Sequence, residues 1–307
     1  MSGPLLVIVG PTAAGKTAAA IAVCERVGGE IVSADSVQVY RGLNIGSAKP
    51  TAEERARVPH HCLDLIDLDM RLDAAGWSAH ADQAIEDIRS RGKVPIICGG
   101  TGLYVRALLH GLIPIPEIPE EVRSTVRKEV ASRGAEVMHE ELAQVDPEAA
   151  ERIAPRDRQR IGRALEVWRT TGRALSAWQA DHRFAETRYD AKVVGLWPER
   201  EVLYERIDRR VDAMLTSGWF DEVEGLLGDG VSPEAPGLQT MGYRDVTACI
   251  RGTQEATEVA ERIARTHRRY ARRQLVWFRG VTTREDALTH YPPDTAGLID
   301  ALVALLA

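Results

Sequence analysis

A glycine-rich segment near the N-terminus has the residues and the spacing of a phosphate-binding loop. Residues 10–17 read Gly-Pro-Thr-Ala-Ala-Gly-Lys-Thr and follow the apolar run Leu5–Val9. After a strand and before a helix, such a loop lets successive backbone N–H groups converge on one phosphate, and the helix N-terminus adds its positive end. Lys16 would supply a full charge to the outer phosphates, and the Thr17 hydroxyl could ligate Mg²⁺. The segment therefore predicts a diphosphate or triphosphate site formed by Gly10, Pro11, Thr12, Ala13, Ala14, Gly15, Lys16 and Thr17.

A carboxylate follows the second apolar run of the chain. Residues 30–34 form this run, and Asp35 comes directly after it. In a parallel α/β sheet the carboxyl ends of the strands line the ligand crevice, so we expect Asp35 to lie near the phosphates held by Lys16. There it could act as a general base toward an acceptor or support Mg²⁺ from the second shell. Capping the start of a helix is the alternative role, because Asp favours that position.

A second glycine-rich turn, Gly-Gly-Thr-Gly at residues 99–102, follows the apolar run 94–98. Glycines at the carboxyl end of a strand allow a ligand to approach the backbone closely. We therefore expect this turn to face the same crevice, with Thr101 as its only polar side chain.

Two basic segments suggest contact with a polyanion. Between residues 152 and 163 there are five arginines and a single acid, Asp157. Gln159 and Arg163 share a helix face opposite an apolar stripe, so the polar face either contacts phosphates or is an ordinary solvated surface.

The second basic segment has no acidic residue from position 262 to 284 and interleaves arginines with aromatic residues, which suits a nucleic acid. We expect Trp277 and Phe278 within it to serve the core, since large aromatics usually pack inside.

The order of the elements predicts an α/β fold. Apolar runs at 5–9, 30–34, 62–66, 94–98 and 192–196 alternate with helical patterns, which indicates a P-loop NTPase-like parallel sheet flanked by helices. The strand spacing widens sharply after residue 98, and the proline-rich stretch 113–119 precedes a charged helical region. We therefore predict a core domain of residues 1–113 and 190–307 and a helical insertion domain of residues 114–189.

Composition narrows the class of protein. The 307 residues carry a net charge of −6, which argues against a general nucleic-acid binder, and the four cysteines lie far apart and form no metal-binding or disulfide pattern. His60-His61-Cys62 suits no common zinc site and is interpreted as the start of a strand. The first apolar run is too short for a signal peptide, and no stretch is long enough to span a membrane. We expect a cytoplasmic monomer without a membrane partner.

The motifs in their order resemble the tRNA dimethylallyltransferases of the bacterial type. The resemblance extends over nearly the whole chain and rests on these sequences: Gly-Pro-Thr-Ala-Ala-Gly-Lys-Thr, Ser-Ala-Asp-Ser-Val-Gln-Val-Tyr, Ile-Gly-Ser-Ala-Lys-Pro, Gly-Gly-Thr-Gly-Leu-Tyr, Asp-Pro, Asp-Arg-Gln-Arg, Met-Gly-Tyr-Arg and Arg-Arg-Gln-Leu-Val-Trp. The departures are Ala14, where serine is common, and Val37.

The resemblance implies transfer of a dimethylallyl group from dimethylallyl diphosphate to the exocyclic N6 amine of the adenosine 3′-adjacent to the anticodon. The loop would then hold a prenyl diphosphate in place of ATP, with Mg²⁺ on Thr17. Asp35 would take the amine proton as general base. Arg210 either acts on the diphosphate or at the reaction centre, or is a surface arginine of a charged helix. The adenosine would leave its stack to enter the site, as is usual for base-modifying enzymes.

The residues that the resemblance assigns to the tRNA anticodon stem-loop come from the core and from the insertion. Arg272 and Arg273 join them from the second basic segment. The predicted set is Asp35, Ser36, Val37, Gln38, Thr101, Arg123, Gln159, Arg160, Ile161, Gly162, Arg163, Arg272 and Arg273.

Three other functions fit parts of the sequence. A small-molecule P-loop kinase would use ATP as donor and Asp35 as base, but a small acceptor does not need the basic insertion. A nucleotide-dependent RNA-binding ATPase would need a convincing second acidic motif, and residues 63–67 match one only loosely. An enzyme that prenylates free adenine nucleotides would also have little use for the insertion.

Overall fold

Parallel strands bring the two glycine-rich turns and Asp35 to one edge of a sheet. The computed structural model describes residues 4–182, 187–281 and 289–306. Its six-stranded parallel sheet runs in the order β3 (His60–His61), β2 (Gly29–Ala34), β4 (Val94–Gly99), β1 (Leu5–Val9), β5 (Ala191–Leu196) and β6 (Thr289–Tyr291). Gly99 is in register with Val9 on one side and with Ala34 on the other. The segments that follow β1, β2 and β4 therefore start side by side, as the sequence predicts.

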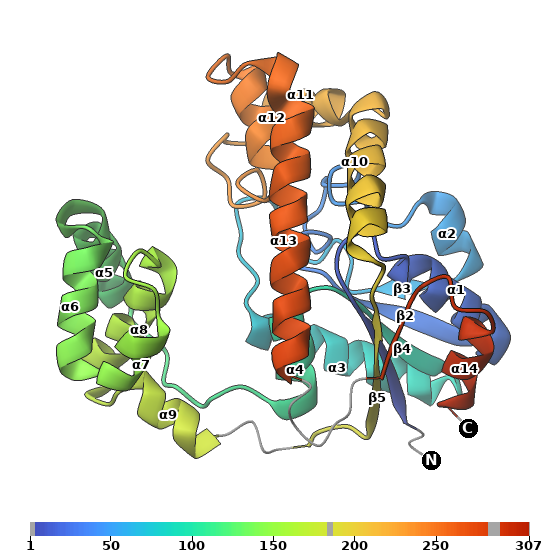
Figure 1. The fold of residues 1–307 in the computed structure, drawn as a ribbon, viewed down its shortest axis with the longest axis horizontal. Coiled ribbons are helices and arrows are strands. Elements are labelled where there is room, and N and C mark those ends of the chain that lie inside the picture. Colours follow the sequence, from blue (N-terminus) through green and yellow to red (C-terminus); the bar gives the residue numbers. More distant parts are fainter. Residues whose placement is uncertain (1–3, 183–186, 282–288, 307) are drawn as a thin grey trace. The chain divides into compact units, whose positions relative to one another are not determined.

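Helices cover this sheet in what we call the core unit, residues 1–109 and 187–307 (Figure 1). Helix α13 packs along α10 and carries most of the second basic segment. In chain order the helices are α1 (Lys16–Val27), α2 (Ala52–Arg57), α3 (Ala74–Ser90), α4 (Gly102–His110), α10 (Arg200–Thr216), α11 (Trp219–Gly228), α12 (Tyr243–Ile250), the 3₁₀ turn η1 (Ala256–Glu258), α13 (Val259–Val281) and α14 (Leu298–Ala304).

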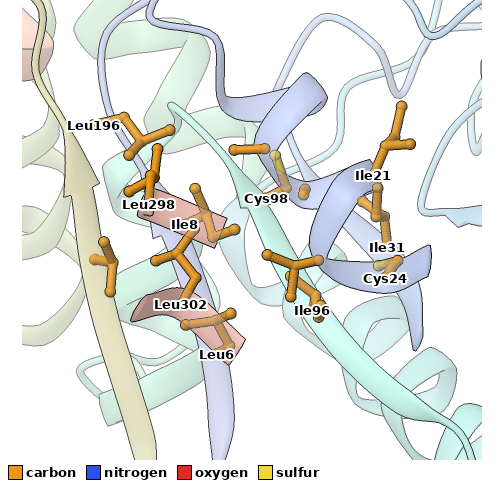
Figure 2. Close-up of a cluster of buried hydrophobic side chains, with 14 of the residues drawn as sticks. Leu6, Ile8, Ile21, Cys24, Ile31, Ile96, Cys98, Leu196, Leu298 and Leu302 are labelled. Carbon is orange, nitrogen blue, oxygen red and sulfur yellow. The ribbon is translucent and has the colours of Figure 1, made fainter. Parts of the chain in front are cut away.

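Helix α1 follows the phosphate loop and is anchored to the sheet on one face. It starts at Lys16, directly after Gly15, and ends at Val27, directly before Gly28. Both glycines adopt the left-handed conformation. Figure 2 shows the cluster beneath it, in which Ile21 and Cys24 pack over the strands. All residues of β1, on both of its faces, are fully buried, which fixes the point at which the phosphate loop begins.

The strand predicted at 62–66 is wrong. The β3 strand is only His60–His61, which agrees with the strand start predicted for this histidine pair. Cys62 and Asp64 then adopt positive φ angles of 61° and 54°, which end an extended chain. The three-residue strand β6 is too short to carry a recognisable pattern and was not predicted.

Residues 110–186 form the second compact region, the insertion unit, which is helical. Its helices are α5 (Glu120–Arg133), α6 (Ala135–Val145), α7 (Pro147–Arg152), α8 (Arg158–Thr171) and α9 (Leu175–His182). They enclose an apolar core of their own that includes Val126, Met138, Leu142, Ile161 and Leu165.

The boundaries of the insertion unit differ from those predicted at 114 and 189. Tyr189 belongs to the core unit because its hydroxyl donates to Asp82 of α3 at 2.6 Å, and Arg188 pairs with the same carboxylate at 2.7 Å. Local sequence pattern cannot reveal such a contact between residues far apart in the chain.

Candidate active site

A cavity of about 540 Å³ opens at the carboxyl edge of the sheet in the core unit. Residues from all three predicted segments line it, among them Lys16, Asp35 and Gly100. A second hollow, of about 880 Å³, also borders the phosphate loop, and Lys16, Thr17 and Arg210 are among the residues that line both. The cations of Lys16 and Arg210 are thus shared by the two hollows.

The phosphate loop is built by its glycines and closed by its lysine. Gly10 has a φ of 153°, and a Cβ there would lie 2.5 Å from the Leu196 carbonyl oxygen. The loop then turns through Ala13, which is left-handed at a φ of 62°. Lys16 Nζ donates to the Pro11 carbonyl at 2.7 Å, so the ammonium group lies over the loop where a phosphate would be held.

Two partly buried cations, Lys16 and Arg210, give the cavity its charge. Burial lowers the pKa of Lys16 to about 8, and the nearby positive charge of Arg210 acts in the same direction. Burial also lowers the pKa of Arg210, and the Asp35 carboxylate opposes that shift. Arg210 Nη1 donates to the Thr12 hydroxyl at 3.3 Å, which places α10 directly against the loop. Because an anion would compensate the cost of burying both cations, the arrangement suits a diphosphate.

Asp35 stabilises a turn and also lines the cavity. Its Oδ1 accepts from the N–H groups of Val37 at 2.8 Å and Gln38 at 3.3 Å, which caps the turn that follows β2. The same side chain lines the cavity that contains Lys16 and Arg210. One carboxylate oxygen therefore fixes the local backbone while the group as a whole lies within the cavity.

The second glycine-rich turn borders the cavity, since Gly99 and Gly100 line it. Its glycines also permit close packing within the protein. A Cβ at Gly99 would lie 2.2 Å from the Ala34 carbonyl oxygen, one at Gly100 2.2 Å from Gln274 Nε2, and one at Gly102 2.1 Å from Trp277 Nε1.

Thr101 in this turn holds the neighbouring loop. Its Oγ1 accepts from the Ser36 N–H at 3.0 Å, and its own N–H donates to the Ala34 carbonyl at 3.1 Å. Hydrogen bonds therefore join the segment 35–38 and the end of β2 to this turn.

The basic face of α13 divides into paired and unpaired arginines. Arg268 pairs with Asp208 at 2.6 Å and Glu261 at 2.8 Å. Arg272 and Arg273 are exposed, and neither forms an ion pair within the described part of the chain. Phe278 is buried as predicted. Trp277 is only half-buried. It packs on Gly102, and the Arg106 guanidinium lies 4.7 Å from its ring centroid.

The arginines of the insertion unit are less free than their sequence suggests. Four of them form ion pairs with acids of the same unit: Arg152 with Glu148, Arg156 with Glu136, Arg160 with Asp157 and Arg163 with Glu166. Only Asp157 lies within residues 152–163, so the composition of this segment does not reveal the other three partners. Of the five, only Arg158 has no ion pair among the described residues.

The predicted tRNA-contact residues of α8 fall into two groups. Gln159, Arg160 and Arg163 are exposed. Ile161 is fully buried in the apolar core of the insertion unit and Gly162 is also buried, so their positions support the exposed face rather than belonging to it. Arg123 is half-buried on α5.

Comparison with known proteins decides the family. A family model described as IPP transferase matches residues 38–281, and one described as isopentenyl transferase matches residues 3–67. The chain belongs to the tRNA dimethylallyltransferase family. It is therefore a transferase of the prenyl-transferring class.

Relatives cover the chain almost completely. The tRNA dimethylallyltransferase of Geobacter sulfurreducens is 48% identical over 275 residues, which is 90% of this chain and 88% of that protein. The tRNA dimethylallyltransferase 1 of Trichlorobacter lovleyi is 46% identical over the full length of both chains.

Solved structures of the family share the fold. A full-length tRNA isopentenylpyrophosphate transferase from Bacillus halodurans superimposes with a TM-score of 0.71 at 36% identity, covering 99% of this chain and 95% of that one. A eukaryotic dimethylallyltransferase described as acting on tRNA gives a TM-score of 0.81 at 26% identity, covering 99% of this chain and 77% of the other. Within the described residues, no helix has the length and apolar character needed to cross a membrane.

Sequence reasoning missed two buried polar residues of this family member, both on α13. Gln274 lines the cavity and bonds to the phosphate loop, although its motif, Arg-Arg-Gln, was recognised. His267 also lines the cavity, and burial together with the Arg210 charge lowers its pKa to about 4. The arginine-rich context of α13 hid both, because it draws attention to the exposed face of the helix.

Proposed function

We propose that this protein transfers a dimethylallyl group from dimethylallyl diphosphate to the N6 amine of the adenosine 3′-adjacent to the anticodon of tRNA. The observation that carries the proposal is the cavity in which two partly buried cations, Lys16 and Arg210, lie near the carboxylate of Asp35. Transfer of a dimethylallyl group from a diphosphate to a weakly nucleophilic amine needs cations at the leaving group and a base at the amine, close together. The family relationship supports this choice of donor and acceptor.

The phosphate loop would bind the diphosphate of the donor. As the allylic C–O bond breaks, negative charge develops on the departing diphosphate, and groups already fixed around it stabilise that charge. Lys16 and Arg210 would supply the charge, and the Thr12 hydroxyl, which Arg210 contacts, would help to orient the phosphates.

Asp35 would act as the general base. An adenine amine is a poor nucleophile because its lone pair is delocalised into the ring, so removal of its proton must accompany formation of the new N–C bond. Oδ1 of Asp35 is engaged by two backbone N–H groups, which leaves the second oxygen to accept the proton. The proton thus moves to Asp35 as the diphosphate leaves with the electron pair of the C–O bond.

The residues of the loop are compatible with Mg²⁺. Among the described residues, no cluster of three or more His, Cys, Asp or Glu side chains could hold a metal alone. The Thr17 hydroxyl borders both hollows, and Mg²⁺ commonly takes few protein ligands together with phosphate oxygens and water. When bound there with the substrate, the ion would neutralise charge on the diphosphate.

The tRNA would contact surfaces on both units. Residues 35–38 and Arg273 line the cavity, and Thr101 bonds to the loop of residues 35–38, so these residues would contact the acceptor adenosine. Arg272 on α13 and Arg123, Gln159, Arg160 and Arg163 on the insertion unit would contact the anticodon stem-loop.

The test is a transfer assay with alternative donors. Purified protein, unmodified tRNA and Mg²⁺ are incubated with dimethylallyl diphosphate in one tube and with ATP in another, and the digested nucleosides are analysed by mass. We expect a dimethylallyl adduct on adenosine in the first tube alone, mapped to the position 3′ of the anticodon by nuclease fragmentation. Phosphate transfer or ATP hydrolysis without an adduct would contradict the proposal and favour a kinase or an ATPase.

A further inference from the structure

Gln274 connects three segments that are far apart in the sequence. Its Oε1 accepts from the N–H of Thr12 in the phosphate loop at 2.9 Å, and its Nε2 donates to the Gly100 carbonyl at 2.9 Å. The side chain is only 7% exposed, so both bonds are formed largely away from water. A buried amide that satisfies a donor and an acceptor on two different loops fixes the distance between those loops.

The packing around Gln274 leaves little freedom. A Cβ at Gly100 would lie 2.2 Å from Nε2, so this position accommodates the amide only because it is glycine. One turn further along α13, Trp277 packs in the same way on Gly102. The helix is therefore held against the 99–102 turn at two successive contacts.

The two loops that Gln274 joins serve opposite sides of the proposed reaction. Thr12 belongs to the loop assigned to the diphosphate, and its hydroxyl also contacts Arg210. Gly100 is followed by Thr101, whose hydroxyl holds the Ser36 N–H next to Asp35 at 3.0 Å. A continuous chain of contacts thus runs from the leaving-group side through Gln274 to the carboxylate.

We infer that Gln274 is a positioning residue that sets the separation between the bound prenyl diphosphate and the acceptor amine at Asp35. It lines the cavity, but its amide oxygen and nitrogen bond to the two loops, so it acts through the positions of those loops. Transfer between two bound substrates is sensitive to their separation, and a misplacement of about 1 Å can cost about 100-fold in rate. The inference rests on the proposed transfer function.

Two substitutions separate positioning from folding. Gln274→Leu keeps the approximate volume and removes both bonds, whereas Gln274→Glu keeps an acceptor for Thr12 and places an oxygen against the Gly100 carbonyl. Gln254→Glu, at an exposed position of the same unit, is the matched control for the added charge.

The experiment measures kcat and the KM of each substrate, with circular dichroism and thermal unfolding to select folded variants. We expect kcat to fall about 100-fold in Gln274→Leu and less in Gln274→Glu, while both KM values and the affinity for inorganic diphosphate change less than about threefold. A folded variant with unchanged kcat would overturn the inference, as would a loss confined to diphosphate affinity, which would make Gln274 part of the binding site. Absence of transfer by the unsubstituted protein would instead contradict the proposed function.

Discussion

The core unit and the insertion unit use polar side chains in different ways. In the core, Lys16 and Arg210 are partly buried and Gln274 is buried, and Arg210 and Gln274 bond to Thr12, which is far away in the sequence. In the insertion, the arginines of α7 and α8 are exposed, and all of them except Arg158 pair with acids of the same unit among the described residues. Shielded groups can be positioned for chemistry because the dielectric is low and few rotamers remain, whereas exposed pairs are weak and exchange readily with water and ions. In the proposed function, the core therefore carries out the reaction and the insertion contributes to tRNA binding.

The largest expected effect is that of removing the base. Asp35→Ala should lower kcat about 1,000-fold while tRNA still binds, because a general base contributes about that much and its loss does not remove the basic surfaces. Steady-state transfer and filter binding measure the two quantities, with Asp229→Asn as an exposed carboxylate control in the same unit. Residual activity near that of the unsubstituted protein would remove Asp35 from the mechanism.

Loss of Lys16 should come next and should carry a pH signature. Since burial lowers the pKa of Lys16 to about 8, the ammonium loses its proton in the free enzyme as the pH rises through that value. We expect kcat/KM for dimethylallyl diphosphate to fall above pH 8, and Lys16→Met to be about 100-fold lower at neutral pH without this inflection. Lys93→Met is the exposed control. If the pH profile of kcat/KM keeps its inflection in Lys16→Met, the group that titrates is not Lys16.

The unpaired arginines of α13 should affect binding more than turnover. Arg272→Ala with Arg273→Ala is expected to raise the dissociation constant for tRNA roughly 10-fold, about 1.4 kcal/mol, and to reduce the salt slope by about 1 for each lost phosphate contact. Titrations at several salt concentrations measure both. Unchanged affinity and slope would exclude this face of α13 from the RNA interface.

The paired arginines of α8 should matter less. Arg160→Ala with Arg163→Ala should weaken tRNA binding only about threefold, because each side chain must give up a partner within the unit before it can bind a phosphate. A loss equal to that of the α13 double variant would show that the ion pairs do not limit these residues and would remove the contrast between the units.

The smallest effect on turnover is expected at His267, where stability changes instead. The folded-state pKa of about 4 is below the ordinary value, so the unfolded chain binds the proton first as the pH falls below about 6.5. Above that pH, His267 is neutral in both states, so its titration does not change the free energy of unfolding. Between that pH and pH 4, the free energy of unfolding falls by about 3 kcal/mol. Denaturant unfolding of His267→Asn should show a shallower loss than the unsubstituted protein and than the exposed control His80→Asn. Identical slopes would contradict the account of this histidine.

The sequence predicts the parts of the site that depend on local pattern. The phosphate loop is recognisable because its glycines and lysine have a required spacing after a strand. The place of Asp35 follows because parallel strands end at one edge. The family could be predicted from the order of its motifs.

The rest depends on contacts between distant residues. Gln274 is 262 positions from Thr12, and no local pattern marks it as a partner of the loop. The same reason explains why the packing of Gln274 and Trp277 on the glycines at 99–102 was not predicted, and why the acids that pair with the insertion arginines were missed. The strand expected at 62–66 failed because two non-glycine residues there adopt the left-handed conformation, which apolar character does not reveal.

Single-turnover transfer at saturating tRNA and saturating dimethylallyl diphosphate tests the division between the units most directly. Saturation removes differences in binding and leaves the rate of the chemical step. We predict that Arg160→Ala with Arg163→Ala reacts within about twofold of the unsubstituted protein, while Asp35→Asn remains about 1,000-fold slower. An insertion variant as slow as Asp35→Asn at saturation would contradict the account, because the insertion unit would then take part in the reaction itself.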